Sequence, residues 1–425
     1  MLGRGNAPQW AGIDRLRELE VCVALFQILD DGKSIGRRSG CVACYLEAGF
    51  YNARTMNQTI SSRLRWGILG AANIALKNWQ SIQDSGSGVV TAVASRSVAR
   101  AEEFIQTCQA SAPQASTPAA LASYDELIAR PDVDAVYIPL PTGLRKEWVI
   151  KAARAGKHVL CEKPCAPNLP DLLEMTRICD NAGVQFGDGV MFMHGGRLEA
   201  LRRVLDTPGA IGQIRRIASG FSFNGGSDFA AGNIRMHSEL EPHGCLGDLG
   251  WYCIRLGLWA LRWQQPERVV GRILHEAACP GSPAPVPTEF SAELFFPEGV
   301  SMTFYCSFIT HDQQWAHISG TEGSLRVDDF VLPFFGDESR FETFQPNFRV
   351  EGCRFNMESH RRTHVVSEYS NNHPTSQEAA LFRNFAAAVQ NPTLRAAWAE
   401  AAVKTQRVME ACLDSARNGS RPVAL

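Results

Sequence analysis

The sequence carries a lysine whose type and position suit proton-transfer chemistry. Lys163 stands in Glu162-Lys163-Pro164, directly after the apolar run of residues 157–161. That run is typical of a buried strand, and the carboxyl ends of parallel strands face the ligand crevice of an open sheet. A lysine placed there can donate a hydrogen bond to a substrate oxygen and lower the pKa of a neighbouring acid. A surface cation after a strand is the alternative role.

An acid and a phenol lie four residues apart further along the chain, at Asp248 and Tyr252. A helix near 248–262 would place both on one face, so that both can reach one substrate carbonyl or hydroxyl. The structural alternative makes Asp248 the helix N-cap and Tyr252 a core residue in a stripe with Leu256 and Trp259. The lysine after the strand favours the chemical interpretation.

A glycine turn near residue 70 predicts a phosphate site. The segment LRWGILGAANIALKNW ends an apolar strand and begins a helix at Gly70-Ala71-Ala72-Asn73, followed by Ile74. Backbone amides and the helix dipole at such a turn can bind a pyrophosphate. Only the first glycine of G-x-G-x-x-G is present, because Ala72 and Ala75 occupy the other two positions. An ordinary strand-to-helix turn is the alternative.

The end of the second strand indicates which dinucleotide would bind. Residues 86–100 contain no Asp or Glu to bind the two ribose hydroxyls, whereas Ser95, Arg96 and Arg100 are present. An arginine there favours a 2′-phosphate, so we expect NADP as the cofactor, with NAD possible. A solvated surface arginine is the alternative interpretation.

Two further segments are expected beside the cofactor. The first is the turn after the strand VDAVYI, whose rigid prolines suit a cofactor wall, although it could equally be a plain loop. The second is the end of the strand that carries Lys163. The cofactor contacts predicted in these segments are Pro139, Leu140, Pro141, Thr142, Glu162 and Lys163.

These residues require a particular set of elements. Residues 63–187 alternate short apolar strands with helices near 73–84, 98–110, 144–155 and 169–182, which predicts an α/β Rossmann domain with a doubly wound parallel sheet. Residues 188–425 predict an α+β domain with a mostly antiparallel open sheet and two closing C-terminal helices. Residues 1–62 show no sustained period, and we expect a disordered leader or a gene-model extension, with Met56 as a candidate start.

Four segments together resemble a known family. GILGAANIA, YIPLPTGLRKEW, GKHVLCEKP and GCLGDLGWYCIR resemble the glucose-fructose oxidoreductase/inositol dehydrogenase family, Gfo/Idh/MocA, over about residues 63–425. Many members have histidine four residues after the aspartate, where this sequence has Tyr252. That departure resembles the branch with dihydrodiol dehydrogenase, xylose dehydrogenase and glucose-fructose oxidoreductase, in which a tyrosine donates or accepts the proton and NADP is often preferred.

The resemblance implies an NAD(P)-dependent oxidoreductase acting on a CH–OH group of a sugar, polyol or vicinal diol. Tyr252 is the expected acid/base, Lys163 is expected to lower its pKa, and Asp248 to orient substrate hydroxyls. His194 and Arg235 are two further candidate substrate contacts. Family members often have arginine at the position of His194, so this histidine could alter the substrate preference. Arg145 stands in the PLP-x-GL-x-x-EW loop at a position where family members frequently have histidine, so the resemblance does not assign its contact.

Three other functions remain open at this point. The first is a catalytically silent nucleotide-binding sensor, since the family's fold also serves a transcriptional regulator. The second is redox-neutral chemistry with a tightly held nicotinamide, which permits elimination or glycoside cleavage. The third is reduction of a tetrapyrrole or an imine. The resemblance also implies a homo-oligomer formed through the open sheet face.

Composition excludes several other classes. A net charge of -2 with 45% hydrophobic residues gives no reason to expect nucleic-acid binding, and no apolar run is long enough to cross a membrane. Cys41 and Cys44 have zinc-knuckle spacing without a second pair, so we predict no metal. The scattered cysteines predict a cytoplasmic protein. Arg37-Arg38 resembles a twin-arginine export signal only weakly, because the segment after it lacks the apolar length and a clean cleavage site.

Overall fold

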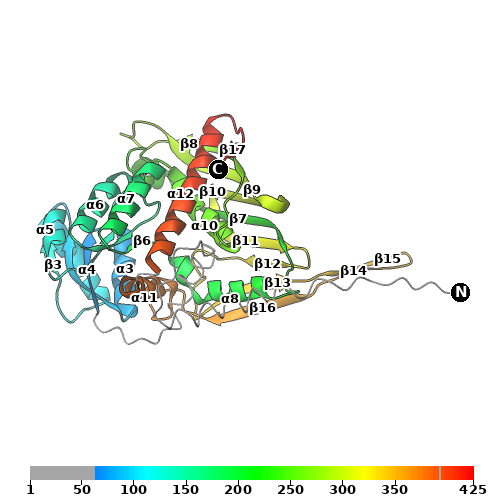
Figure 1. The fold of residues 1–425 in the computed structure, drawn as a ribbon, viewed down its shortest axis with the longest axis horizontal. Helices are drawn as coiled ribbons and strands as arrows, with labels where there is room; N and C mark the ends of the chain where they lie inside the picture. Colours follow the sequence, from blue (N-terminus) through cyan, green and yellow to red (C-terminus); the bar gives the residue numbers. More distant parts are fainter. Residues whose placement is uncertain (1–62, 392–393) are drawn as a thin grey trace, which may run out of the picture. The chain divides into compact units, whose positions relative to one another are not determined.

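A parallel sheet of six strands forms the first half of the chain in this computed structural model, which describes residues 63–391 and 394–425 (Figure 1). The strand order is β3-β2-β1-β4-β5-β6. The strands are β1 (Leu64–Leu69), β2 (Gly88–Ala94), β3 (Ala119–Leu121), β4 (Ala135–Ile138), β5 (His158–Cys161) and β6 (Phe186–Asp188). The connecting helices are α3 (Asn73–Asp84), α4 (Val98–Ser111), α5 (Tyr124–Ala129), α6 (Arg145–Arg154) and α7 (Leu169–Asn181), with the 3₁₀ turn η1 (Thr142–Leu144). The predicted Rossmann domain is confirmed, whereas the leader predicted for residues 1–62 lies outside the described residues.

The sequence analysis missed one strand and one helix of this sheet. β3 has three residues and α5 has six, and both are too short to display a period of their own. α5 begins at Ser123, whose hydroxyl accepts a hydrogen bond from the amide of Glu126. The four predicted helices, α3, α4, α6 and α7, agree with the structure to within two residues at each end.

The second half forms a nine-stranded sheet in the order β16-β13-β12-β11-β7-β10-β9-β8-β17. Its strands are β7 (Ile214–Asn224), β8 (Arg268–Ala277), β9 (Val286–Phe295), β10 (Ser301–Ser307), β11 (Ile309–Gly320), β12 (Ser324–Val327), β13 (Glu338–Phe344), β16 (Arg361–Ser367) and β17 (Val423–Ala424). Only β7 and β10 pair in parallel. The predicted α+β class with a mostly antiparallel sheet is confirmed.

Helices cover one face of this sheet. They are α8 (Gly196–Asp206), α10 (Trp251–Ala260) and α12 (Arg395–Arg417). The shorter helical elements of this half are η2 (Met191–His194), α9 (Gly226–Gly232), η3 (Ile234–Met236), η4 (Leu246–Gly250) and η5 (Pro297–Gly299). α10 approaches β10 so closely that a Cβ on Gly257 would meet Met302 Sδ at 2.0 Å. The strand residues on this face are buried, as Met302, Phe304 and Cys306 illustrate.

The C-terminal segment returns to the first sheet. α11 (Gln377–Gln390) packs on α3, and its Phe382 and Phe385 contact Trp66 of β1 at ring-centroid distances of 5.3 and 5.2 Å. α12 runs past both β6 and β8, as Figure 1 shows. These helices therefore hold the two sheets together.

A buried ion pair lies where α10, α12 and β6 meet. Arg255 Nη2 is 2.5 Å from Asp188 Oδ2, and both side chains are fully buried. Trp398 Nε1 also donates to Asp188 Oδ1, at 3.1 Å, and Arg255 Nε donates to Thr405 Oγ1, at 2.7 Å. The four residues come from β6, α10 and α12, so the pair fixes the approach of the two helices to the first sheet.

Removal of this carboxylate should destabilise the fold. Asp188→Ala leaves a buried, uncompensated guanidinium, which typically costs about 3–5 kcal/mol. Urea unfolding measures the change. The control is Glu147→Ala, which breaks a 2.9 Å pair with Lys151 on the surface, where a change below about 1 kcal/mol is expected. Equal effects of the two substitutions would contradict the assigned role of the buried pair.

Candidate active site

A cavity of about 1150 Å³ opens between the two halves of the chain. One wall consists of the turn before α3 and the ends of β4 and β5. The other walls come from η3, η4, α10 and strands β7 and β11. The cavity therefore lies at the carboxyl ends of the parallel strands, where ligands bind in open α/β sheets.

The deep end of the cavity brings together the three residues predicted to do chemistry. Lys163 Nζ donates to Asp248 Oδ1 at 2.7 Å and to the Asp248 carbonyl oxygen at 2.6 Å. The same ammonium nitrogen lies 4.5 Å from the centroid of the Tyr252 ring. Arg235 Nε lies 2.7 Å from the other oxygen of Asp248. Asp248 is thus held between two cations, and all four residues line the cavity.

A π-helical turn positions Asp248. η4 spans Leu246–Gly250 and leads directly into α10, so Asp248 is in the middle of the turn and is not a helix N-cap. The backbone passes close to its neighbours, because a Cβ on Gly247 would lie 3.1 Å from Pro164 Cγ. π-helical turns are rare and frequent at functional sites. This one presses Asp248 against the segment that carries Lys163.

The two cations control the charge of Asp248. Burial would raise its pKa, but Arg235 and Lys163 outweigh burial and lower the pKa to about 2. Tyr252 shows the opposite direction, because burial and the nearby carboxylates of Glu162 and Asp248 hold its pKa well above 10. The net shift of the Tyr252 pKa is therefore upward, opposite to the lowering predicted from Lys163. The physical reason is burial of the phenol first and the two neighbouring carboxylates second.

The glycine turn has the geometry of a phosphate cradle. Gly70 has φ +113°, and an added Cβ would lie 3.0 Å from Leu140 Cδ2. α3 begins after Ala72 with no side-chain cap, so its first amides are oriented toward the cavity end of the helix. Residues 71–74 line the cavity, while Gly70 itself lies behind that wall. These features fit a dinucleotide pyrophosphate.

The predicted 2′-phosphate residues occupy different positions relative to the cavity. Ser95 is buried and its amide donates to Leu121, so its side chain does not line the cavity. Arg96 is exposed and is not among the residues that line the cavity, whereas Arg100, in the first turn of α4, lines it. Neither arginine forms an ion pair with any residue in the described ranges. Their charges are available for an anion.

Sequence reasoning missed Tyr124 in this region. Its hydroxyl lies 3.7 Å from the position of a Cβ on Gly70, and its ring packs edge-on against Trp148 at 4.8 Å. Burial raises the pKa of Tyr124, and the charges of Arg96 and Arg100 oppose that rise. A phenol therefore faces the phosphate turn. Its position after the unpredicted strand β3 gave no signal in the sequence.

The loop after β4 agrees with the prediction only in part. Pro139 and Leu140 line the cavity, but Pro141 and Thr142 do not. Thr142 is buried, and its hydroxyl donates to Glu241 Oε2 at 2.5 Å while its amide donates to Oε1 at 3.0 Å. The expected cofactor contact of Thr142 is therefore corrected, because this side chain holds Glu241 in the wall.

Arg145 stabilises the loops that flank the cavity. Its guanidinium is buried and donates to the carbonyl oxygens of Leu140 at 2.6 Å, Glu162 at 2.9 Å, and Pro164. It also lies 3.9 Å from Glu241. The arginine thus fastens the ends of β4 and β5 to each other, a role that the sequence left open.

Glu162 lines the cavity at the end of β5 and continues a chain of buried hydrogen bonds. Tyr137 donates its hydroxyl proton to Glu162 Oε1 at 2.7 Å and accepts from Asn78 Nδ2 at 2.6 Å. Position 189 requires glycine, because a Cβ on Gly189 would lie 2.8 Å from the same carboxylate oxygen. The carboxylate is thereby fixed beside Lys163.

The two tentative substrate residues have different outcomes. Arg235 lines the cavity and binds Asp248. His194 is buried away from the cavity, where its Nδ1 is 3.0 Å from Asn384 Nδ2 and its ring lies 4.9 Å from the ring of Trp398. The tentative assignment of His194 is therefore corrected, because η2 turns its side chain toward α11 and α12.

The second half supplies an apolar wall that the sequence analysis did not predict. Met191 contacts the Tyr252 hydroxyl through its sulfur at 3.6 Å. Phe221, Trp315 and the exposed Phe334 also line the cavity. No local motif marks these residues, because they come from separate strands and loops that meet only in the folded chain.

Residues 63–391 and 394–425 contain neither a membrane-spanning helix nor a metal-binding cluster. No helix there is long and apolar enough to span a membrane. The described ranges also contain no cluster of three or more His, Cys, Asp or Glu side chains arranged to hold a metal ion.

Comparison with family models agrees with this combination of fold and site. Residues 64–189 match the model described as the oxidoreductase family with an NAD-binding Rossmann fold. Residues 198–326 match the GFO/IDH/MocA C-terminal domain, and residues 275–425 match the oxidoreductase family C-terminal alpha/beta domain. The fold and site thus define a nicotinamide-dependent oxidoreductase.

Individual relatives place the chain more closely. It is 33% identical over 281 residues, 64% of this chain and 74% of the relative, to the dTDP-3,4-didehydro-2,6-dideoxy-alpha-D-glucose 3-reductase of Streptomyces violaceoruber. It is 33% identical over 274 residues, 64% of this chain and 76% of the relative, to the trans-1,2-dihydrobenzene-1,2-diol dehydrogenase of Mus musculus.

A solved structure shares the whole fold. KijD10, a 3-ketoreductase from Actinomadura kijaniata crystallised with NADP and TDP-benzene, has a TM-score of 0.68 at 25% identity, covering 85% of this chain and 98% of its own. The chain belongs to the Gfo/Idh/MocA oxidoreductase family, as the resemblance in the sequence predicted.

The paired charges predict a pH-dependent contribution of Asp248 to stability. Its folded pKa of about 2 is below the ordinary value of 3.8, so the ionised form stabilises the fold above pH 4, and this contribution is lost as the pH falls toward 2. Asp248→Asn should therefore cost about 2 kcal/mol at pH 6 and progressively less below pH 4. Urea unfolding from pH 6 to pH 3 measures the difference, and a constant difference would refute this account.

Proposed function

We propose that the chain is an NADP-dependent oxidoreductase that transfers hydride to or from a carbon of a sugar, polyol or vicinal diol. Tyr252 acts as the acid/base, assisted by Lys163, and Asp248 orients the substrate. The observation that carries the proposal is the meeting of these three residues in one cavity with the glycine turn. The names of the relatives, a sugar ketoreductase and a diol dehydrogenase, support the same substrate classes.

NADP is the cofactor that the residues of the turn fit. Residues 71–74 would hold the pyrophosphate, and Arg96 and Arg100 the 2′-phosphate. When bound, NADP supplies the hydride donor or acceptor for the reaction. The solved relative was crystallised with NADP, which supports this choice over NAD.

The protein side chains manage the proton and the substrate. Tyr252 retains its hydroxyl proton at neutral pH because its pKa is high, so it is suited to protonate the oxygen of a carbonyl substrate. Lys163 lies over the ring of Tyr252 and can stabilise the negative charge that the phenol acquires after giving up its proton. Ionised Asp248 accepts hydrogen bonds from substrate hydroxyls and keeps Lys163 and Arg235 in place. These roles favour reduction of a carbonyl.

The cavity charges suit an uncharged substrate at the reacting end. The cations of Lys163 and Arg235 are balanced there by the carboxylates of Asp248 and Glu162, while Arg145 faces Glu241. Polar hydroxyl-bearing carbons would meet Asp248, and the apolar ring faces of a sugar or diol would meet Phe221 and Tyr252, whose rings lie 5.6 Å apart.

We further propose that the chain forms a homo-oligomer through the face of the nine-stranded sheet opposite the helices. That face carries half-exposed residues such as Thr303 and Tyr305. No helix within the described ranges covers it. Open antiparallel sheets commonly bury such a face against a second subunit.

We propose a cytoplasmic location because the described cysteines are free thiols. Of these, Cys353 is exposed. Free thiols, one of them exposed to solvent, are typical of reducing compartments.

Removal of the phenol hydroxyl tests the acid/base assignment. Tyr252→Phe should lower kcat by about 10²–10⁴-fold in NADPH oxidation assays with ketoses, aldoses and diketones, since a positioned proton donor contributes that much. NADPH affinity measured by fluorescence titration should remain unchanged. The control is Tyr305→Phe, a tyrosine of β10 whose hydroxyl binds Glu289. Unchanged turnover in the Tyr252 variant would refute its role, and substrate conversion without net NADPH oxidation would favour redox-neutral chemistry.

Removal of one arginine tests the cofactor preference. Arg96→Ala should raise the Kd for NADP about 10–100-fold, the value of a lost charge-assisted bond, and leave the Kd for NAD within about threefold. Arg177→Ala removes an exposed arginine of α7 and provides the control. Equal losses for NADP and NAD would contradict a 2′-phosphate contact.

A further inference from the structure

A long β-ribbon projects from the edge of the nine-stranded sheet. β13 continues into β14 (Asn347–Glu351), and β15 (Arg354–Glu358) continues into β16, so that residues 338–367 form one hairpin. The register is uninterrupted, since Phe344 pairs with Arg361 and the amide of Gln345 donates to His360. Figure 1 shows the outer half, β14 and β15, extending well away from the sheets.

The tip is a tight two-residue turn at Gly352-Cys353. Gly352 has φ +61°, which suits the first central position of a type II′ hairpin turn. The turn matches the twist of the strands, so the ribbon has a defined end. We name residues 345–360, which project beyond the sheet, the arm.

The arm has one apolar face and one polar face. Phe348 pairs with Met357 and Val350 pairs with Phe355, so these four side chains share one face. Their exposed fractions are 54, 67, 53 and 70%, respectively. The residues that alternate with them on the other face are Asn347, Arg349, Glu351, Arg354, Asn356 and Glu358.

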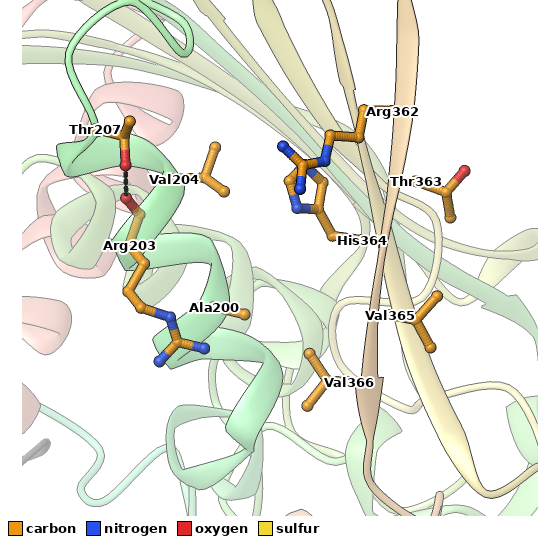
Figure 2. Close-up of a pocket in the computed structure, with 9 residues that line it drawn as sticks. All are labelled: Ala200, Arg203, Val204, Thr207, Arg362, Thr363, His364, Val365 and Val366. Carbon is orange, nitrogen blue, oxygen red and sulfur yellow. Dashed lines mark hydrogen bonds between the residues drawn. The ribbon is translucent and has the colours of Figure 1, made fainter.

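The apolar face of the arm continues the open face of the sheet. Figure 2 shows that Arg362, His364 and Val366 of β16 lie on the side of α8, whereas Thr363 and Val365 lie on the opposite side. Because the register is unbroken, the strand alternation places the apolar face of the arm on the same side as Thr363 and Val365. It therefore faces away from α8, and no described element covers it.

An isolated two-stranded ribbon with four large apolar side chains in water is marginally stable. We therefore expect another surface to cover the arm. The charges of the adjacent open sheet face indicate that this surface belongs to a second copy of the chain. Glu289 and Glu293 of β9 share that face with Arg216 of β7 and Arg272 of β8. None of these four forms an ion pair with another residue in the described ranges. A surface with unpaired charges of both signs can complement itself under a two-fold rotation.

We propose that the arm docks on a second copy of this chain, with its apolar face packed on the partner's surface as an extension of the open-face interface. This inference rests on the proposed oligomer. In a two-fold pair each subunit contributes one arm and receives the other, so both apolar faces are buried. The arm then adds an apolar anchor to an interface whose sheet portion is largely polar.

The test is the oligomeric mass of the full chain, measured by light scattering over a concentration series. Wild-type protein should be a dimer, and Phe348→Asp/Phe355→Asp should raise its dissociation constant at least about 100-fold. The matched control, Asn347→Asp/Asn356→Asp, adds the same two charges to the polar face and should change the constant less than about threefold. Thr303→Arg in the centre of the sheet face should also give monomers.

Hydrogen exchange provides a second measurement of the arm itself. Amides of residues 347–358 should be protected in the wild-type dimer and should exchange rapidly in the Thr303→Arg monomer. A wild-type dimer that is unaffected by the phenylalanine substitutions would overturn the arm proposal and leave the sheet interface intact. A monomeric wild type would overturn both, and its co-sedimentation with phosphatidylcholine vesicles would assign the apolar face to a lipid surface instead.

Discussion

The ion pair between Lys163 and Asp248 is the contact on which the rest of the site depends. It joins the end of a strand in the first sheet to a turn below the second, across 85 residues of sequence. Both side chains are largely buried, so the charges stabilise each other with little competition from water. Arg235 also binds Asp248, and the position of Tyr252 follows from α10, which begins directly after the π-helical turn that contains Asp248.

Several buried polar contacts preserve that geometry. Arg145 fastens the ends of two strands through their carbonyl oxygens, and Arg255 with Asp188 anchors α10 to the first sheet. A buried ion pair gives modest net stability, yet losing one partner is expensive, so such contacts specify one arrangement of the elements. The segment with Asp248 and Tyr252 is therefore held at two places, by Lys163 at Asp248 and by Arg255 within α10.

The sequence predicted the elements better than their assembly. Local periodicity was enough for the long helices and strands, because a buried face must repeat at the period of its backbone. It failed for β3 and α5, which are shorter than the pattern that would reveal them. It also failed for His194 and Thr142, since the direction of a side chain at the end of a strand or in a turn depends on packing from distant segments.

The sequence by itself determined the fold class and the family, and it singled out Lys163, Asp248 and Tyr252 as candidates, because these depend on short motifs and on hydrophobic repeats. Only the tertiary structure decided the electrostatics of the site. Burial, with Glu162 and Asp248, raises the pKa of Tyr252, and the nearby Arg235 and Lys163 lower the pKa of Asp248, a result of distances that no local spacing encodes. The tertiary structure likewise revealed the second wall of the cavity and the exposed face of the arm, since both arise from long-range strand pairing.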